Sequence, residues 1–424
     1  MGYVRSPRTD SDLIGIWYHV ASESGSVEVA TCPVKSIALA MDRNRRDTMP
    51  SSSGLLAHSA MFSPAPQTPS PSSGKKKVIY DQDHRGPLST DTVATLMLLQ
   101  ADNIDLLGIC TVSCDMWAKQ ETAYALRLLE IMGRPEIPVF MGAQEPLLNT
   151  KAEAQMRYEM FGSRSLGNEG YLGCFAKDAP GRDQLTPLPP PYNLFAQIKA
   201  QPEPAADFII RTIRANPNEV TMYCGGPMTN LALAVMLAPD IVPITKEVIF
   251  MGGGIHHSTS SVNVYFDAEA AKIGFRAGFP KFTLVTTDLA EEVHMQDDGK
   301  VDDIVDHAHP PIADLFREYE QKPQRANPQR KSFRMPDEMM AAHTIDSSIF
   351  TGYDEMFIDI VTHDDGHYGD TSFWDANWKD EGGELAGQNN PSLKAGRVQV
   401  LNGIDKKRFR ELFADLMTRP IKIK

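Results

Sequence analysis

The pattern of apolar and polar residues changes at Lys77 and stays regular from there onward. Residues 78–80 (Val-Ile-Tyr) form a short apolar run typical of a buried strand, and residues 93–99 form a longer apolar run with helical spacing. Runs of these two kinds then alternate. The remaining expected strands are residues 104–112, 137–141, 220–223, 248–251, 282–286, 357–362 and 398–401, and the remaining expected helices are residues 119–132, 205–215, 230–237, 268–277, about 301–321, 337–346 and 406–417.

This alternation predicts the fold class. A strand followed by a helix and then by another strand is the unit of a parallel sheet with helices on its faces. We therefore expect an α/β fold with a single open, mostly parallel sheet flanked by helices, in one continuous domain over residues 77–424. Residues 150–202 are rich in Gly and Pro and are expected to be less regular.

The first 76 residues have a different composition. They are rich in Ser, Pro, Arg and Asp, and residues 63–74 (Ser-Pro-Ala-Pro-Gln-Thr-Pro-Ser-Pro-Ser-Ser-Gly) offer almost no apolar side chain that a core could bury. Residues 1–76 are therefore predicted to be a low-complexity, disordered extension of the domain.

Charge and cysteine content narrow the class of partner. The chain has 42 Lys and Arg against 55 Asp and Glu, and its net charge of −13 repels phosphate backbones and anionic lipid surfaces. We expect no nucleic-acid partner and no membrane contact, since no apolar run approaches the roughly 20 residues of a membrane helix. The five scattered cysteines favour reduced thiols and the cytoplasm over a disulfide framework. A neutral small molecule, a bound cation and a homo-oligomer all fit this composition.

Polar stretches follow four of the expected strands. In an open parallel sheet, ligands bind beyond the carboxyl ends of the strands, where loops and helix N-termini converge. The four stretches are Asp81-Gln82-Asp83 with Asp91, residues 111–115 (Thr-Val-Ser-Cys-Asp), residues 225–230 (Gly-Gly-Pro-Met-Thr-Asn) and residues 251–254 (Met-Gly-Gly-Gly). The sequence therefore predicts a ligand site at this edge of the sheet.

Asp81, Asp83 and Asp91 bring three carboxylates into a small part of that edge. Crowded carboxylates repel one another unless a cation or shared protons offset their charge. A hard cation with oxygen ligands is the simplest solution, and Ca²⁺ is favoured when a main-chain carbonyl joins the site. From spacing alone an alternative stays open, in which Asp91 caps a helix and the other two carboxylates are solvated.

The same residues carry a family resemblance. Residues 78–83 (Val-Ile-Tyr-Asp-Gln-Asp), followed by residues 90–94 (Thr-Asp-Thr-Val-Ala), resemble the N-terminal DxDxGxDD block of the inosine-uridine-preferring nucleoside hydrolases. Residues 115–120 and 262–267 resemble more closely a divergent branch of this family, similar to fungal and bacterial secreted members. Further blocks resemble this family in the expected order, namely residues 106–112, 125–130, 133–139, 226–232, 251–253, 263–271 and 337–342. The resemblance covers most of residues 77–420. It implies a hydrolase that cleaves the N-glycosidic bond of a ribonucleoside or related N-riboside to give ribose and free base.

The resemblance also implies a metal site and a catalytic base. In this family the metal is Ca²⁺, and the matching positions make Asp83, Asp91 and Asp337 carboxylate ligands and give Thr229 a main-chain oxygen ligand. Asp83 is also the expected catalytic residue, which accepts a proton from the attacking water, and Asp81 is its supporting neighbour. General chemistry agrees, because a bound cation lowers the pKa of a water and a nearby carboxylate completes the deprotonation.

Asn263, Asp115 and Thr90 are the expected contacts to ribose. An amide offers both a donor and an acceptor to a vicinal diol, and Asn263 has this role by resemblance. Asp115 stands where the family usually has Asn, and Thr90 where it usually has a second acidic residue. The six residues 84–89 also make the first block longer than the common one. Asp267 is interpreted as the N-cap of a helix.

Two further departures concern the leaving group. Ser261 stands where many members have Glu, and Pro336 stands where many have a His associated with protonation of the leaving base. The Pro ring cannot donate a proton. His256 and His257 offer a substitute, with a solvated loop pair as the alternative, whereas His343 is expected to be a packed or surface residue of a helix.

Three functions are therefore compared. The first is an active hydrolase of nucleosides or related N-ribosides. The second is a catalytically impaired member of the family that binds the metal and a sugar-like ligand but protonates the leaving group poorly. In the third, Asp81 and Asp83 form the nucleophile and acid pair of a phosphatase, against which the downstream blocks argue. Because the similar branch is often exported, secretion stays open beside the cytoplasm.

Overall fold

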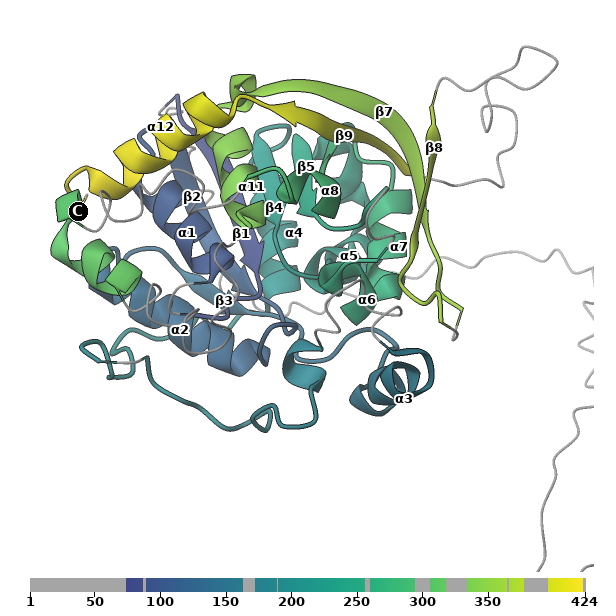
Figure 1. The fold of residues 1–424 in the computed structure, drawn as a ribbon, viewed down its shortest axis with the longest axis horizontal. Helices are drawn as coiled ribbons and strands as arrows, with labels where there is room; N and C mark the ends of the chain where they lie inside the picture. The colour runs from purple at the N-terminus through teal and green to yellow at the C-terminus, as the bar shows by residue number, and fades with distance from the viewer. Residues whose placement is uncertain are drawn as a thin grey trace, which may run out of the picture. The chain divides into compact units, whose positions relative to one another are not determined.

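The computed structural model describes residues 74–86, 89–162, 172–188, 190–255, 260–293, 306–317, 334–363, 366–376 and 396–421. They form a nine-stranded sheet in the order β3-β2-β1-β4-β5-β6-β9-β7-β8 (Figure 1). All neighbouring pairs from β3 to β9 are parallel, whereas β7 is antiparallel to both β9 and β8. The strands are β1 (Lys76–Gln82), β2 (Ile104–Thr111), β3 (Val139–Met141), β4 (Val220–Cys224), β5 (Glu247–Met251), β6 (Phe282–Val285), β7 (Phe350–Ile360), β8 (Thr371–Asp375) and β9 (Gly396–Ile404).

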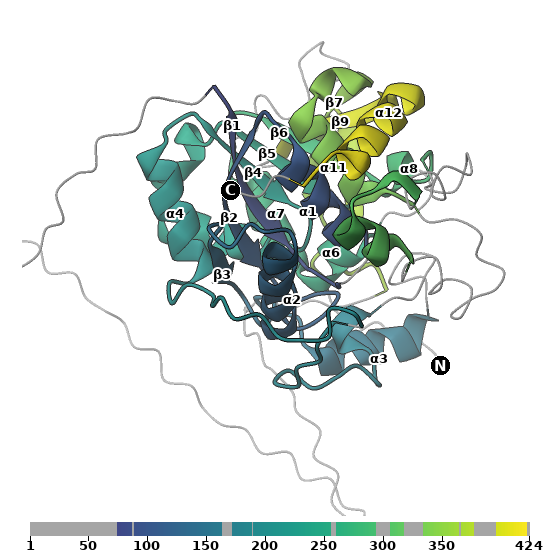
Figure 2. The same ribbon diagram turned by 90° about the vertical axis from the view of Figure 1, so that its left-hand side faces the viewer.

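Helices cover both faces of the sheet. Figure 2 shows α4 on one side of the strands and α11 and α12 on the other. Among the described residues, no helix combines the length and the apolar character needed to cross a bilayer. The helices are α1 (Thr90–Gln100), α2 (Ala118–Ile131), α3 (Lys151–Phe161), α4 (Ala205–Ala215), α5 (Thr229–Leu237), α6 (Val262–Phe266), α7 (Ala268–Arg276), α8 (Thr287–Ala290), α11 (Pro336–Ile345) and α12 (Lys406–Thr418), with 3₁₀ turns at η2 (Gly173–Phe175), η3 (Pro239–Ile244) and η4 (Ser347–Ile349).

The strand β1 supplies side chains to both layers of the core. Val78 and Tyr80 pack in the cluster that includes residues of α1 and α11, whereas Ile79 packs in the cluster that includes residues of α4 and α5. This division follows from the two-residue period of a strand, and all three side chains are fully buried. An apolar run with no polar face is what a strand in the middle of a parallel sheet requires.

The strand order reverses at β1. The chain passes outward from β1 to β2 and β3, and then returns to place β4 on the other edge of β1. Asp81 is in register with Cys110 of β2 and with Cys224 of β4, so the carboxyl ends of the three strands are level. In sheets of this kind ligands bind where the strand order reverses. The residues that follow β1 are therefore placed at the favoured position for a ligand site.

The predicted fold class is confirmed. Each strand and helix expected between residues 78 and 141 and between residues 205 and 286 is present, as are the expected helices near the positions of α11 and α12. Of the helix expected over residues 301–321, residues 306–307 and 310–317 are helical and residues 308–309 interrupt them, whereas residues 301–305 and 318–321 lie outside the described residues. Residues 1–73 also lie outside them, so the disordered extension over residues 1–76 stays a prediction.

Residues 150–202, which were expected to be less regular, include the helix α3, which was not predicted. This helix begins with Thr150 as its N-cap, whose Oγ1 atom accepts a hydrogen bond from the main-chain N of Glu153 and donates one to the Glu153 carboxylate at 2.8 Å. The helix carries few buried side chains, among them Ala154 and Arg157. Apolar periodicity therefore indicated this helix only weakly, whereas the Thr150 and Glu153 pair at its start was a stronger indication.

The strand expected over residues 357–362 is misplaced. The observed β7 begins at Phe350 and ends at Ile360, and β8 was not predicted. The first half of β7 contains Gly352 and Asp354, which apolar periodicity does not assign to a strand. Its conformation follows from pairing with β9, where Tyr353 is in register with Leu401. Distant pairing thus overrides the local pattern.

The amino end of β1 holds the carboxyl end of α11. Lys76 Nζ donates hydrogen bonds to the main-chain oxygens of Thr344 at 2.9 Å and Ile345 at 3.0 Å. Asn103 Nδ2 donates to the Ile345 oxygen at 2.9 Å. A cation at the carboxyl end of a helix also interacts favourably with the helix dipole. The helix that carries Asp337 in its first turn is thereby fixed to the central strand.

We predict that Lys76→Met lowers the free energy of unfolding by about 2 kcal/mol, because two carbonyls lose a charge-assisted hydrogen bond while the aliphatic packing is kept. The measurement is chemical denaturation of the full chain. Lys75→Met is the matched control, since Lys75 is exposed and its substitution is expected to change stability by less than about 0.5 kcal/mol. Equal losses in the two variants would contradict the role of Lys76.

Candidate active site

Asp81 and Asp83, at and just beyond the end of β1, are buried, with 1% and 6% of their surfaces exposed. Asp81 Oδ1 accepts a hydrogen bond from Asn230 Nδ2 at 2.8 Å, while Asp81 Oδ2 is buried without a hydrogen-bond partner. Burial raises the pKa of Asp81 to about 7, and the Asn230 amide partly offsets this effect. Asn230 also donates to the Thr111 oxygen at 3.1 Å and accepts from the Ala143 N–H at 2.8 Å. Asp81 therefore belongs to a network that ties the ends of β1, β2 and β3 to α5.

Asp83 is enclosed by the loops that follow β2 and β4. Its Oδ2 atom accepts a hydrogen bond from the main-chain N of Asp115 at 3.4 Å. On the side of the other loop, a Cβ at Gly226 would stand 2.9 Å from Asp83 Oδ1 and 3.0 Å from Asp83 N. Only glycine lets the turn before α5 approach this carboxylate so closely.

Asp91 and Asp337 approach the same place from two helix N-termini. Asp91 lies in the first turn of α1, where its Oδ2 atom accepts a hydrogen bond from the main-chain N of Arg85. Its Oδ1 atom is buried without a hydrogen-bond partner. Asp337 lies in the first turn of α11, and its Oδ2 atom accepts a hydrogen bond from the Thr90 hydroxyl. Thr90, an expected ribose contact, thus contacts an expected metal ligand in this structure.

Two buried tyrosines fix the main chain at these aspartates. Tyr80 of β1 donates its hydroxyl proton to the main-chain oxygen of Asp91 at 2.8 Å, and Tyr223 of β4 donates to that of Asp337 at 2.8 Å. The two rings contact each other, with centroids 4.6 Å apart. Adjacent strands thereby set the positions of both helix N-termini.

The aspartates of this group raise one another's pKa. Burial is the largest cause at Asp83, and the negative charges of Asp115, Asp91 and Asp337 add to it, so the pKa of Asp83 lies well above its ordinary value. Burial and the charges of Asp115 and Asp337 have the same effect on the pKa of Asp91. Burial raises the pKa of Asp337 to about 6, despite the hydrogen bond from Thr90. Crowded buried carboxylates with an unpartnered oxygen fit a bound hard cation.

Thr229 and Asn263 lie in the two helices that complete this edge. Thr229 begins α5, and its hydroxyl donates to Asp267 Oδ2 at 2.7 Å. Asp267 accepts through its other oxygen from the first turn of α7 at 3.0 Å, which confirms it as an N-cap. Asn263 lies in α6 and donates through Nδ2 to the main-chain oxygens of Gly225 and of Met251, the latter at 3.1 Å. Its amide thus bridges the ends of β4 and β5.

Asp115 lies in the loop between β2 and α2, which is held from several sides. Its own main-chain N donates to Asp83, and the main-chain N of Met116 donates to Glu121 Oε1 at 3.0 Å. The main-chain oxygen of Cys114 accepts from the N–H of Cys174 in η2 at 2.8 Å. The loop is therefore fixed to β1, to α2 and to η2.

Two buried glutamates near the site were missed by the sequence analysis. Burial is the main cause that raises the pKa of both Glu121 and Glu338 well above the ordinary value. Helical spacing offered a signal for Glu121, because it lies on the same face of α2 as Ala125 and Leu128. Glu338 follows Asp337 in α11, and both of its carboxylate oxygens are buried without a hydrogen-bond partner. No local pattern distinguishes it from a solvated glutamate.

The positions that depart from the family pattern have structural roles. Pro336 is the first residue of α11, where the missing N–H of proline costs little. Ser261 Oγ accepts a hydrogen bond from a main-chain N of the glycine run at 2.9 Å. His343 is buried, so it is a packed residue of the helix, one of its two expected settings. His256 and His257, the expected substitutes for the leaving-group acid, lie outside the described residues.

Curated relatives match about half of the chain. A protein named probable uridine nucleosidase 2 from Arabidopsis thaliana is 30% identical over 233 residues, which are 53% of this chain and 63% of that protein. The pyrimidine-specific ribonucleoside hydrolase RihB of Escherichia coli O157:H7 is 27% identical over 210 residues, which are 49% of this chain and 58% of that protein. Each alignment thus spans less than two thirds of the relative's length.

Solved structures and a family profile match more of the chain. A plant nucleoside hydrolase superimposes with a TM-score of 0.62 at 23% identity, over 81% of this chain and 99% of that one. A purine-preferring ribonucleoside hydrolase from Gardnerella vaginalis gives a TM-score of 0.59 at 20% identity, over 81% and 98%. At these identities the structures show a shared fold. The sequence profile described as inosine-uridine preferring nucleoside hydrolase matches residues 78–411, and the chain therefore belongs to that family.

Proposed function

We propose that this protein is a metal-dependent hydrolase that cleaves the N-glycosidic bond of a ribonucleoside, or a related N-riboside, to give ribose and free base. The observation that carries the proposal is the group formed by the buried aspartates Asp83, Asp91 and Asp337 and the partly exposed Asp115, near the strand reversal of a chain that belongs to the nucleoside hydrolase family. The names of two relatives, a uridine nucleosidase and a pyrimidine-specific ribonucleoside hydrolase, favour a pyrimidine nucleoside as the first substrate to test.

The proposed cofactor is Ca²⁺, with carboxylate ligands from Asp83, Asp91 and Asp337 and a main-chain oxygen from Thr229. An all-oxygen set suits a hard cation, and Asp91 Oδ1 is a buried oxygen that has no hydrogen-bond partner. A positive charge here offsets the mutual repulsion that raises the pKa of these carboxyls. When bound, such a cation lowers the pKa of a water and so supplies a nucleophile near neutral pH.

Asp83 is the proposed general base. It lies just beyond β1, where the charges of Asp115, Asp91 and Asp337 act on it, and its carboxylate can accept the proton of a water that attacks the anomeric carbon. The surrounding carboxylates stabilise the positive charge that develops on the ribose ring as the glycosidic bond breaks. Asp81, which bonds to Asn230, supports the strand end from within the network described above.

Ribose is proposed to contact Asn263, Asp115 and Thr90. Three contacts support this proposal, since Asn263 contacts the end of β4, the main-chain N of Asp115 contacts Asp83 and Thr90 contacts Asp337. Asp115 accepts hydrogen bonds from hydroxyls but donates none when ionised. Pro336 cannot protonate the leaving base, and His256 and His257 remain the proposed substitutes.

The binding-only alternative is not favoured by the comparisons, because the relatives that carry functional names are nucleosidases or ribonucleoside hydrolases. The phosphatase alternative requires Asp81 and Asp83 to act together on one ligand. It is weakened by the engagement of Asp81 with Asn230 and by the family match.

We predict that the protein releases ribose from uridine or inosine in the presence of Ca²⁺ and that a chelator abolishes this release. Asp83→Asn is expected to lower kcat by about 10²–10⁴-fold, the usual contribution of a general base. Asp240→Asn is the matched control, because Asp240 is exposed and pairs with Arg214 on the surface. Ribose release that survives both the chelator and Asp83→Asn would contradict the proposal.

We also predict that Ca²⁺ stabilises the folded chain, a readout that requires no catalysis. At 100 times its dissociation constant, the ion is expected to add about 2.7 kcal/mol to the free energy of unfolding. Asp337→Asn should remove most of this gain, whereas Asp240→Asn should keep it. The measurement is thermal unfolding with Ca²⁺ and with chelator. An equal gain in Asp337→Asn and wild type would exclude Asp337 as a ligand.

A further inference from the structure

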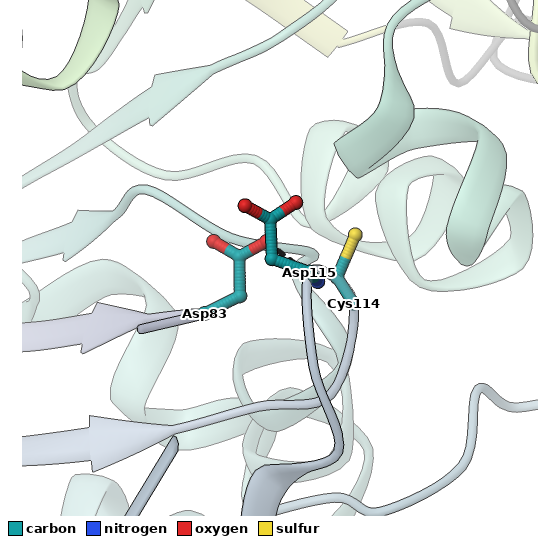
Figure 3. Close-up of side chains that lie close together, drawn as sticks. All are labelled: Asp83, Cys114 and Asp115. Atoms are coloured by element: carbon teal, nitrogen blue, oxygen red, sulfur yellow. Dashed lines mark hydrogen bonds between the residues drawn. The ribbon is translucent and has the colours of Figure 1, made fainter. Parts of the chain in front are cut away.

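A thiol lies among the carboxylates, and the proposed reaction gives it no role. The Sγ atom of Cys114 and the carboxylate oxygens of Asp83 and Asp115 include donor atoms that all lie within 4.8 Å of one another. Figure 3 shows the three side chains side by side, with Cys114 and Asp115 on one loop and Asp83 coming from the end of β1. Cys114 is fully buried, whereas Asp115 is partly exposed and gives the group an open side. Sulfur and oxygen donors are thus available together.

Glu121 holds the loop that carries Cys114 and Asp115 and has a buried carboxylate oxygen without a hydrogen-bond partner. Its Oε1 atom accepts the hydrogen bond from Met116, but its Oε2 atom is buried without a hydrogen-bond partner, and the residue is fully buried. Glu121 interacts electrostatically with Asp83 and Asp115, and Cys114 interacts with Glu121 in turn. A buried carboxylate oxygen without a partner is costly unless a proton or a cation satisfies it.

We propose that Asp83, Cys114 and Asp115, next to the buried carboxylate of Glu121, form a binding site for a thiophilic divalent cation of the Zn²⁺ and Cd²⁺ class. On binding, the sulfur of Cys114 bonds to the cation through a lone pair and the thiol proton passes to solvent. Zn²⁺ prefers four donors in tetrahedral geometry, at about 2.3 Å for sulfur and about 2.1 Å for oxygen, which places donors about 3.5 Å apart. Because the donor atoms lie within 4.8 Å of one another, binding requires them to move closer together by at most about 1.3 Å.

This site differs from the proposed Ca²⁺ site in its chemistry and shares one residue with it. The Ca²⁺ set of Asp83, Asp91, Asp337 and Thr229 contains only oxygen donors, whereas the new set contains sulfur, which selects softer cations. Because both sets need Asp83, the two cations compete. If the proposed function holds, occupation by Zn²⁺ also withdraws Asp115 from ribose, so Zn²⁺ inhibits hydrolysis in competition with the nucleoside.

The first experiment titrates the full chain with Cd²⁺ in Ca²⁺-free buffer and records the ultraviolet charge-transfer absorption of a cadmium–thiolate bond. We expect one saturable absorption change in wild type, its loss in Cys114→Ala and its retention in Cys224→Ala. Cys224 is the matched control because it is a fully buried cysteine of β4. No absorption change in wild type, or the same change in Cys114→Ala, overturns the proposal.

A second variant decides the question if Cys114→Ala does not fold. Asp115→Asn changes a partly exposed side chain and keeps the thiol, and it is expected to weaken Cd²⁺ binding by at least about tenfold. Unchanged affinity in Asp115→Asn would overturn the proposed site.

The last measurement separates the site from the catalytic function. Ribose release is followed at fixed Ca²⁺ with increasing Zn²⁺, and each variant is compared with its own rate without Zn²⁺. We expect inhibition of wild type at Zn²⁺ concentrations at least about tenfold lower than for Cys114→Ala. If no ribose is released but the cadmium–thiolate absorption appears and depends on Cys114, the site stands and the proposed function fails. Equal inhibition of both proteins overturns the link between the site and catalysis.

Discussion

The structure depends on the burial of several carboxyls at the point where the strand order reverses. Removing a carboxylate from water costs several kcal/mol unless a partner compensates it. The first turns of α1 and α11 place Asp91 and Asp337 at the positive ends of helix dipoles, but each such interaction contributes only about 0.3–1 kcal/mol. The dipoles are therefore too weak to hold all these groups ionised. The carboxyls therefore either keep protons or bind a cation. Which of the two occurs determines whether the site can bind a metal and activate water.

The surrounding scaffold keeps the carboxyls together despite their repulsion. Tyr80 and Tyr223 stand on adjacent strands and bind the main chain at Asp91 and Asp337, so the helix N-termini cannot move apart without breaking buried hydrogen bonds. Asn230 links the ends of β1, β2 and β3, because its Nδ2 atom donates to Asp81 and to the Thr111 oxygen and its Oδ1 atom accepts from the N–H of Ala143. Such an arrangement is preorganised. The unfavourable free energy of bringing like charges together is compensated when the chain folds, and it does not have to be supplied again when a ligand binds.

Apolar periodicity predicted the sheet because its central strands bury side chains on both faces, as Val78, Ile79 and Tyr80 show. It failed where pairing between distant segments decides the structure, as in β7 and β8. The predicted carboxyl end of β1 also indicated the position of Asp81 and Asp83. Which carboxyls interact was not readable from spacing, since Asp83 interacts with Asp337 across 254 positions of sequence and Asp81 bonds to Asn230 instead. The burial of Glu338 had no local signal, because burial follows from the packing of α11 against the rest of the domain.

The division of the site between separate segments has a consequence for how such a protein diversifies. The proposed oxygen ligands of the cation come from the end of β1 and from the starts of α1, α5 and α11, whereas Cys114 and Asp115 belong to the connection between β2 and α2. Mutations in that connection can alter the part of the site formed by Cys114 and Asp115 while the proposed cation ligands stay in place. Natural variation or directed evolution that targets this connection can therefore explore new sugar-like ligands, or new metal sensitivities, with the chemical centre preserved.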